Sequence, residues 1–310
     1  MAALCVYAAY TYNSSSTYLI NGQIYGTYWS VTSTKYIDLT TQKRIKERLK
    51  EIDLIASNYN ENSELAIINK LPIAETVVIS NELNYLLEAS ESVHYLTNGL
   101  FNIVMGIESS LMGFGPKLNT EIIHKNIRWL KEAYLLNSFE LTKHQEFHFD
   151  LSAIAKGFAV DEISKILINE GYNNFVLDIG GELAIFGRKL ESSWTIAIQD
   201  PSYQSSQPIY SFSANTPMYL ATSGEYRNYK YDMYGNRLTH TIDPRTYSSI
   251  QNKGLSVTVR NKASAMLADA YATALNVMDV EEGLKFANSN NIQVMYITSD
   301  KIYFSESWDD

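Results

Sequence analysis

The chain has 310 residues, of which 45% are hydrophobic and 19% are charged, so it can bury the core of one large domain or two closely packed ones. Its formal net charge of −9 argues against a general nucleic-acid binder, because such a protein would present a basic face. The single cysteine, Cys5, excludes an internal disulfide, and the sequence lacks the run of about 18 apolar residues that a membrane-spanning helix needs.

The N-terminus is apolar and uncharged for about a dozen residues, but it has neither the basic start nor the small-residue cleavage site of a signal peptide. A polar spacer follows at residues 13–17, as expected between an anchor and a folded body. We therefore interpret residues 1–20 as an apolar tail or the remnant of a membrane anchor, and residues 21–310 as one folded domain.

The first half of this domain contains clear secondary-structure patterns. Residues 23–34 alternate and are rich in aromatic and β-branched side chains, which predicts a strand. Residues 40–56 repeat apolar side chains along one face, which predicts an amphipathic helix. A second helix is expected from Ser80 to a C-cap at Gly99. Beyond it we expect a weak helix over residues 119–133 and strand character over residues 135–150.

The second half begins with a helix that ends near Asn169. The remaining patterns predict strands around residues 178–181, 194–199, 209–222 and 255–259, hairpins at 226–237 and 292–304, and helices at 264–278 and 280–289. These elements do not follow a regular βαβ period, and neither GxGxxG nor GxxxxGK[ST] is present. The order of elements predicts a single α+β, or mixed α/β, body.

One stretch, FDLSAIAKGFAVD at residues 149–161, joins a predicted strand end to a helix. Asp150 lies at the strand end, and Lys156 lies in the first helical turn. Unpaired N–H groups at a helix N-terminus bind anions, and a nearby lysine is suited to phosphate. The alternative is that Asp150 caps the helix and Lys156 is solvated, and this stretch alone leaves it open.

A second stretch, SAMLADAYATAL at residues 264–275, consists of small and apolar residues and is expected to be a buried helix. Asp269 and Thr273 are four residues apart and share a face. A buried carboxylate must be paired or bound, and two hard oxygen ligands suit Mg²⁺. The alternative is that Thr273 bonds back to the Asp269 carbonyl while Asp269 caps a neighbouring loop.

A third stretch, residues 221–245, places His240 near Glu225, Asp243 and Arg245 in the sequence. A histidine followed by an acidic turn is a candidate general base, although a lone histidine is also a common structural residue. Ser223 lacks the GxSxG surroundings of a nucleophile elbow, so we interpret it as part of a turn that exposes backbone N–H groups.

Together these stretches resemble the FAD:protein FMN transferase family, also called ApbE. The strongest matches are DxxxIAKGxAVD at residues 150–161, ATSGxY at 221–226, HxIDPRT at 240–246, and SVTV with LADAxATAL at 256–259 and 267–275. Weaker matches are GT at 26–27, SEL at 63–65, TNGLFN at 97–102, GFGP at 113–116 and DIGGE at 178–182. They occur in the family's order. The chain departs from the family at Asn102, where the family usually has an acid.

The resemblance implies a single T-fold-like body with antiparallel sheets and packed helices. It also implies Mg²⁺-dependent transfer of the FMN part of FAD to a threonine hydroxyl of an acceptor protein, with release of AMP. The metal ligands would be Asp269, Thr273 and the backbone carbonyl of Ala153, and His240 would deprotonate the acceptor. The FAD contacts would be Tyr59, Leu100, Phe101, Asn102, Asp150, Lys156, Ile242 and Asp243.

Two other functions use the same residues. One is a Mg²⁺-dependent FAD diphosphatase that gives FMN and AMP, and the other is a flavin-binding protein without turnover. By the resemblance, the acceptor would carry an FMN-binding domain with the target threonine. The protein would then act outside the cytoplasm, at the periplasmic face of the bacterial inner membrane, with a possible N-terminal membrane tether.

Overall fold

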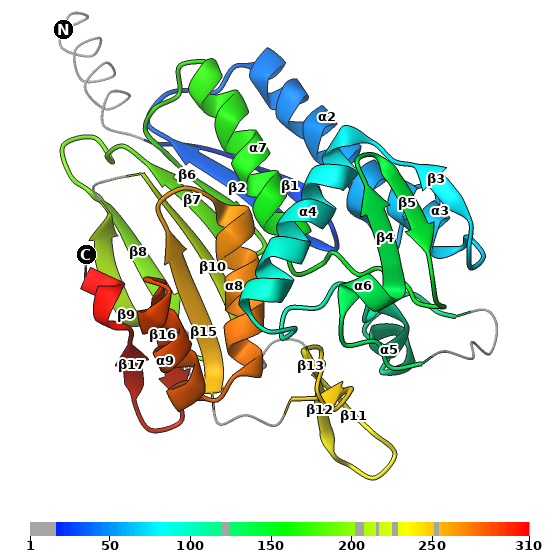
Figure 1. Cartoon of the computed structure of the whole chain (residues 1–310). Helices are drawn as coiled ribbons and strands as arrows, with labels where there is room; N and C mark the ends of the chain where they lie inside the picture. The colour runs from blue at the N-terminus through cyan, green and yellow to red at the C-terminus, as the bar shows by residue number, and fades with distance from the viewer. Residues whose placement is uncertain are drawn as a thin grey trace, which may run out of the picture.

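The computed structural model describes residues 17–118, 125–201, 208–214, 217–224, 229–250 and 254–309. Within these residues an eight-stranded sheet crosses the molecule in the order β1-β2-β6-β7-β10-β15-β16-β17 (Figure 1). Each neighbouring pair is antiparallel. The strands are β1 (Tyr18–Ile24), β2 (Thr27–Ser33), β6 (Phe175–Ile179), β7 (Glu182–Phe186), β10 (Met218–Gly224), β15 (Gly254–Asn261), β16 (Gln293–Thr298) and β17 (Ile302–Phe304). The predicted mixed class with antiparallel sheets is confirmed.

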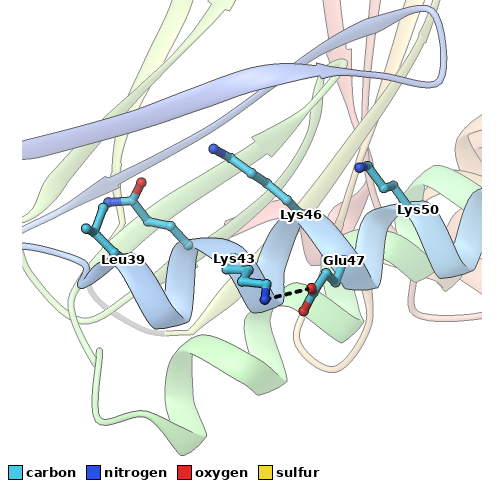
Figure 2. A pocket seen from close by; sticks show the side chains of 6 residues that line it. Leu39, Lys43, Lys46, Glu47 and Lys50 are labelled. Atoms are coloured by element: carbon cyan, nitrogen blue, oxygen red, sulfur yellow. Dashed lines mark ion pairs between the residues drawn. The ribbon is translucent and has the colours of Figure 1, made fainter.

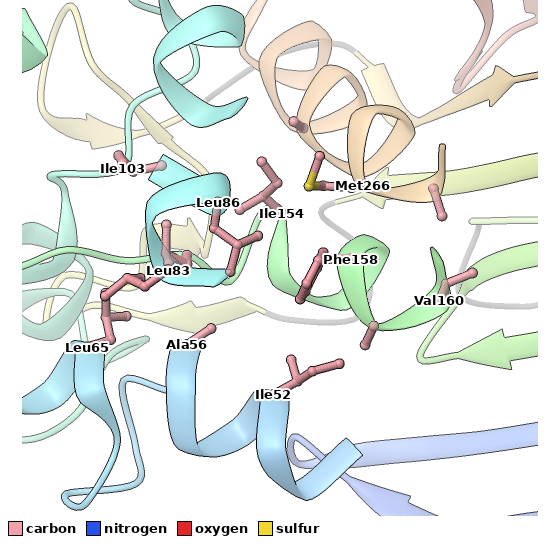
Figure 3. Packing of buried hydrophobic residues seen from close by; sticks show 14 of the residues in the cluster. Ile52, Ala56, Leu65, Leu83, Leu86, Ile103, Ile154, Phe158, Val160 and Met266 are labelled. Carbon is pink, nitrogen blue, oxygen red and sulfur yellow. The ribbon is translucent and has the colours of Figure 1, made fainter. Parts of the chain in front are cut away.

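Helices cover one face of this sheet. They are α2 (Leu39–Ala56), α4 (Asn81–Leu96), α7 (Ala155–Asn169), α8 (Ala265–Val277) and α9 (Val280–Ser289) (Figure 1). Ile52 of α2, Phe158 of α7 and Met266 of α8 belong to one buried cluster (Figure 3). Because α7 packs against both α2 and α8, the central helix is enclosed by its neighbours.

The opposite face of the sheet carries a separate hydrophobic cluster. It is covered by the hairpin of β8 (Trp194–Gln199) and β9 (Pro208–Ala214) and by the short helix η1 (Glu306–Asp309). Along β16, Val294 belongs to the helix-side cluster and Met295 to this one. Strand β16 is therefore buried on both faces, which explains its nearly continuous apolar sequence.

A smaller three-stranded sheet lies beside the main body, at the right of Figure 1. It consists of β3 (Thr76–Val78), β5 (Glu140–Lys143) and β4 (Tyr134–Asn137), with the short helices α3 (Glu64–Asn69), α5 (Gly106–Leu111) and α6 (Leu130–Ala133) nearby. Leu65 of α3 and Leu141 of β5 belong to the same buried cluster as α2 and α7. One continuous core therefore joins the two parts.

Two short hairpins project near the C-terminal end of α8 (Figure 1). One pairs β11 (Tyr229–Tyr231) with β12 (Arg237–Thr239), and the other pairs β13 (Ile242–Asp243) with β14 (Ser248–Ser249). The backbone N–H of Thr239 donates to Ser249 Oγ at 2.6 Å, which connects the two hairpins. His240 lies between them and is therefore held on both sides.

Two strand predictions had wrong bounds. Residues 23–34 contain the end of β1, a turn and β2, because Tyr25 and Gly26 both adopt positive φ (53° and 70°), as a two-residue hairpin turn requires. The strand predicted to reach Asp150 ends at Lys143. Beyond it, the backbone bonds to other loops, since the Asp150 N–H donates to the Ile103 carbonyl at 2.7 Å. The alternation there reflects packing, and Asp150 lies in a loop.

Several expectations fall wholly or partly on residues outside the described part of the chain. They concern residues 1–16 of the N-terminal tail, 119–124 of the weak helix, Glu225, and the start of the hairpin predicted at 226–237. Residues 17–20 of the expected tail are placed, and β1 begins at Tyr18. Of the helices in the described residues, none combines the length and the apolar character that crossing a membrane requires.

Candidate functional site

The first turn of α7 touches the middle of α8. The Gly157 N–H donates to Asp269 Oδ2 at 3.1 Å, across 112 residues of sequence, and Asp269 is only 5% exposed. A Cβ on Gly157 would lie 2.4 Å from the Ala265 carbonyl oxygen, so only glycine permits this approach. The AKG sequence therefore places the buried carboxylate of Asp269 at the N-terminus of α7.

Asp161 makes a second contact between the same helices, one turn further along α7. Its carboxylate accepts hydrogen bonds from Ser264 Oγ at 2.6 Å and from the backbone N–H groups of Ala265 at 2.7 Å and Met266 at 3.2 Å. It thus caps α8 from outside that helix. Asp161 is the last residue of the DxxxIAKGxAVD motif, and no role was predicted for it. Its spacing of four residues from Gly157 places the two residues on one helix face.

Lys156 lies among oxygen atoms from three segments. Its Nζ is 3.2 Å from Glu182 Oε1 and 3.7 Å from Asp269 Oδ2, and it donates to the Ser152 carbonyl at 3.3 Å. Burial alone would lower the pKa of Lys156, but Asp269 and Glu182 outweigh it and raise the pKa, so the ammonium stays charged. The alternative of a freely solvated lysine is wrong.

Glu182 is the site residue that the sequence analysis missed. It begins β7 directly after the Gly180–Gly181 turn and is 3% exposed. Its Oε2 has no hydrogen-bond partner among the residues that the structure describes. Burial raises the pKa of Glu182 to about 8 although Lys156 lowers it, and the charge of Asp269 adds to the rise. The signals in the sequence were an acid that opens a buried strand after two glycines and the weak family match DIGGE at residues 178–182.

The predicted metal ligands lie on the two elements that meet here. Ala153 is in the turn before α7, and Thr273 is one helical turn beyond Asp269; both are half-buried. The described residues contain no cluster of three His, Cys, Asp or Glu side chains that could hold a metal. A carboxylate, a hydroxyl and a carbonyl are nonetheless hard oxygen donors, so the residues present fit Mg²⁺. Burial raises the pKa of Asp269, and a cation would oppose this.

Asp150 does not cap α7. Its Oδ1 accepts from the Ser152 N–H at 3.0 Å within the preceding loop, and the N-cap position of α7, Ile154, makes no side-chain hydrogen bond. The capping alternative is therefore wrong. In the first turn of α7, the side-chain acceptor is instead Asp269, which binds the Gly157 N–H from α8.

A second group of site residues is aromatic and more exposed. The Tyr59 hydroxyl donates to the Phe114 carbonyl, and the Phe114 ring packs edge-on against His240, with 6.3 Å between ring centroids. The Lys230 ammonium lies 5.3 Å from the Phe114 ring centroid. Partial burial and the charge of Asp150 raise the pKa of Tyr59. The structure thus brings Tyr59 and His240 together around Phe114.

The His240 segment is attached to the C-terminal end of α8. Asn276 Nδ2 donates to Thr241 Oγ1 at 3.2 Å, and Arg245 donates to the Val277 carbonyl at 3.4 Å. Asp243, three residues after His240 in the sequence, forms an ion pair with Arg245 at 2.9 Å. Ile242 is half-buried in β13. Helix α8 therefore carries Asp269 and Thr273 and also positions the candidate base.

The segment at residues 100–102 is held by the core. Leu100 and Phe101 are buried, and the Asn102 amide donates to the Ile127 carbonyl at 3.0 Å. His94 Nδ1 lies 2.7 Å from the Phe101 carbonyl, and burial lowers the pKa of His94, so the neutral ring donates this bond. The side chains of Leu100 and Phe101 are buried, and the Phe101 N–H donates to Thr97 Oγ1 at 3.1 Å, so this segment is fixed by side-chain burial and by backbone hydrogen bonds.

A shallow hollow lies elsewhere, on the solvent face of α2 (Figure 2). It is lined by Leu39, Gln42, Lys43, Lys46, Glu47 and Lys50. Lys43 and Glu47 form an exposed ion pair at 3.6 Å there, which contributes little to stability. None of the predicted site residues lines this hollow.

Comparisons with known proteins agree over nearly the whole chain. The model of the ApbE family matches residues 25–296. The chain is 32% identical over 276 residues to the FAD:protein FMN transferase of Vibrio cholerae serotype O1, covering 86% of this chain and 82% of that protein. It is 30% identical over 300 residues to the FAD:protein FMN transferase of Haemophilus influenzae, covering 90% and 85%.

Solved structures give the same result. The flavin transferase ApbE from Vibrio cholerae matches with a TM-score of 0.83 at 30% identity, over 95% of this chain and 98% of that one. The apo form of the flavinyl transferase ApbE from Pseudomonas stutzeri matches with a TM-score of 0.82 at 25% identity, over 95% and 96%. The similarity includes every segment of the candidate site.

Proposed function

The chain belongs to the ApbE family, and from this premise we propose that it transfers the FMN part of FAD to a threonine hydroxyl of an acceptor protein, releasing AMP. The observation that carries the proposal is the contact between α7 and α8, where Lys156 and Asp269 meet at a helix N-terminus. This junction combines positive charge, backbone N–H groups and hard oxygen ligands, as a diphosphate with a bound cation requires.

In the proposed reaction, the acceptor oxygen forms a bond to the phosphorus of the FMN half of FAD. The bond from that phosphorus to the bridging oxygen breaks, and AMP leaves with the bridging oxygen and its electron pair. The hydroxyl proton passes to the imidazole of His240. A threonine hydroxyl is a weak nucleophile at neutral pH, so the base is needed.

The residues at the junction have distinct roles in this proposal. Lys156, at the positive end of the α7 dipole, binds the phosphates and compensates their charge. Mg²⁺ held by Asp269, Thr273 and the Ala153 carbonyl would neutralise further charge on the diphosphate. Tyr59 presents its ring to the flavin from the aromatic group around Phe114. Asp150, the backbone of residues 100–102 and the turn at Ile242 and Asp243 complete the FAD contacts.

The test of the proposed function is product analysis. The purified chain is incubated with FAD and Mg²⁺, with and without an acceptor domain that contains a threonine. We expect AMP to appear together with an acceptor that has gained the mass of FMN less water. Release of AMP and free FMN without an acceptor would identify the diphosphatase instead, and intact FAD in every sample would favour a binding protein.

We further propose that the acceptor carries an FMN-binding domain and that the reaction takes place outside the cytoplasm, with a possible N-terminal membrane tether. A single cysteine is compatible with an oxidising compartment. Fractionation of cells that express the full chain tests the location. Recovery of the protein only in the cytoplasm would contradict it.

A further inference from the structure

A buried lysine next to a proposed metal ligand presents an electrostatic problem. The Lys156 ammonium is 3.7 Å from Asp269 Oδ2, so it competes with any divalent cation for that carboxylate. The same ammonium is closer to Glu182 Oε1, at 3.2 Å. The two carboxylates are 5% and 3% exposed, so water screens little of these interactions.

Glu182 is fixed in place by the turn that precedes it. Gly180 and Gly181 both have positive φ (67° and 107°), and the Gly181 N–H donates to Asp178 Oδ1 at 2.8 Å. A Cβ on Gly180 would lie 2.8 Å from the Thr27 side chain, so the turn is packed against β2. The carboxylate at the start of β7 therefore reaches Lys156 from a rigid hairpin.

We propose that Glu182 is a positioning residue that holds the Lys156 ammonium away from Asp269 and so keeps Asp269 available to a divalent cation. The inference rests on the proposed function, because it takes Asp269 as the Mg²⁺ ligand. Among the described residues, the buried Glu182 Oε2 has no hydrogen-bond partner. This oxygen can therefore accept a further hydrogen bond when the site is filled.

A double-mutant cycle on Mg²⁺ binding tests the proposal. Mg²⁺ alone is titrated calorimetrically at pH 9, above the raised pKa of Glu182, into the full chain and into Glu182→Gln, Lys156→Met and the double variant. We expect Glu182→Gln to weaken Mg²⁺ binding on the order of tenfold, as loss of a residue that orients a metal ligand does. Lys156→Met should strengthen it. In the Lys156→Met background, Glu182→Gln should change the affinity by less than about twofold, since no ammonium remains to be held.

The cycle separates this role from a simple effect of charge. If Glu182 acted only through its own negative charge, Glu182→Gln would weaken binding equally in both backgrounds, and the proposal would be wrong. Weaker Mg²⁺ binding by Lys156→Met than by the wild-type chain also overturns the proposal. This measurement still tests the proposal if Glu182→Gln does not fold. Glu182→Asp, which keeps the charge, should recover part of the lost affinity.

A wild-type chain that binds no Mg²⁺ overturns the inference as well. That result leaves flavin transfer to be judged separately, by the mass of the acceptor.

Discussion

The two halves of the candidate site differ in how they are built. The junction of α7 and α8 is buried, charged and fixed by contacts between helices, with Asp269 only 5% exposed. The aromatic group of Tyr59, Phe114 and His240 lies on loops and beside short hairpins, and Tyr59 is 66% exposed. In the proposed reaction, a diphosphate needs rigid, desolvated charges, whereas a protein acceptor must reach His240 from solvent. The difference in burial supports this proposed division between FAD activation and acceptor entry.

The largest expected effect lies at the junction. Asp269→Ala removes the carboxylate and leaves Lys156 with Glu182 alone, so flavin transfer should fall by at least roughly 10²–10³-fold at any acceptor concentration. Initial rates of acceptor labelling measure this loss. Glu281→Gln, an exposed acid on α9, is the control and should retain activity. Transfer by Asp269→Ala at the wild-type rate would contradict the assignment of Asp269.

The aromatic half should respond differently. His240→Ala should lower transfer by roughly 10²–10⁴-fold, because a positioned proton acceptor is lost. Its FAD affinity, measured by fluorescence titration, should stay near the wild-type value, since the junction is intact. His144→Ala, at an exposed histidine, is the matched control. Equal loss of FAD binding and transfer would show that the two halves are not separate in function.

Gly157→Ala tests the contact between the two helices. Helix propensity alone predicts that this change stabilises the protein by about 1 kcal/mol. The clash with the Ala265 carbonyl predicts the opposite sign, a loss of about 1–3 kcal/mol in the free energy of unfolding. Urea denaturation measures it, with Lys165→Ala on the exposed side of α7 as the control. An increase in stability would mean that α7 and α8 are further apart than described.

The last effect concerns pH and the metal-free protein. The pKa of Glu182 is raised from 4.5 to about 8 in the folded chain, so between these values the folded state binds more protons than the unfolded one. This group therefore lowers stability as pH rises through that window, by at most about 1.4 kcal/mol per pH unit. Urea unfolding with chelator at pH 5 and pH 8 should show the decline, and Glu182→Gln should reduce it. An unchanged slope in the variant would contradict this origin.

Much of the fold could be predicted because its helices carry strong local signals. The expected helix at residues 40–56 is α2, and its N-cap Asp38 accepts from the Thr40 and Thr41 N–H groups. The hairpin turn at Tyr25 and Gly26 could not be predicted from the sequence. A tyrosine at φ 53° is unusual, and the two flanking strands share one alternating pattern. The alternation before Asp150 was misleading, since those residues pack against α3 and other loops without pairing.

The site was only partly accessible to sequence reasoning. The family motifs identified Lys156, Asp269 and His240, but they did not show which of these residues meet. The ion pair of Lys156 with Glu182 depends on three-dimensional packing between α7 and β7, and a single acid after two glycines carries little information by itself. Likewise, Asp243 is adjacent to the candidate base in sequence but pairs with Arg245.

The most direct test of the account is to locate the metal and the diphosphate. Crystals of His240→Ala, soaked with FAD and with Mn²⁺ as a substitute for Mg²⁺, would be measured by anomalous diffraction. We predict an anomalous peak bounded by Asp269, Thr273 and the Ala153 carbonyl, with the FAD phosphates at the N-terminus of α7 next to Lys156. A peak away from the α7–α8 junction, or phosphates bound elsewhere, would contradict the central claim.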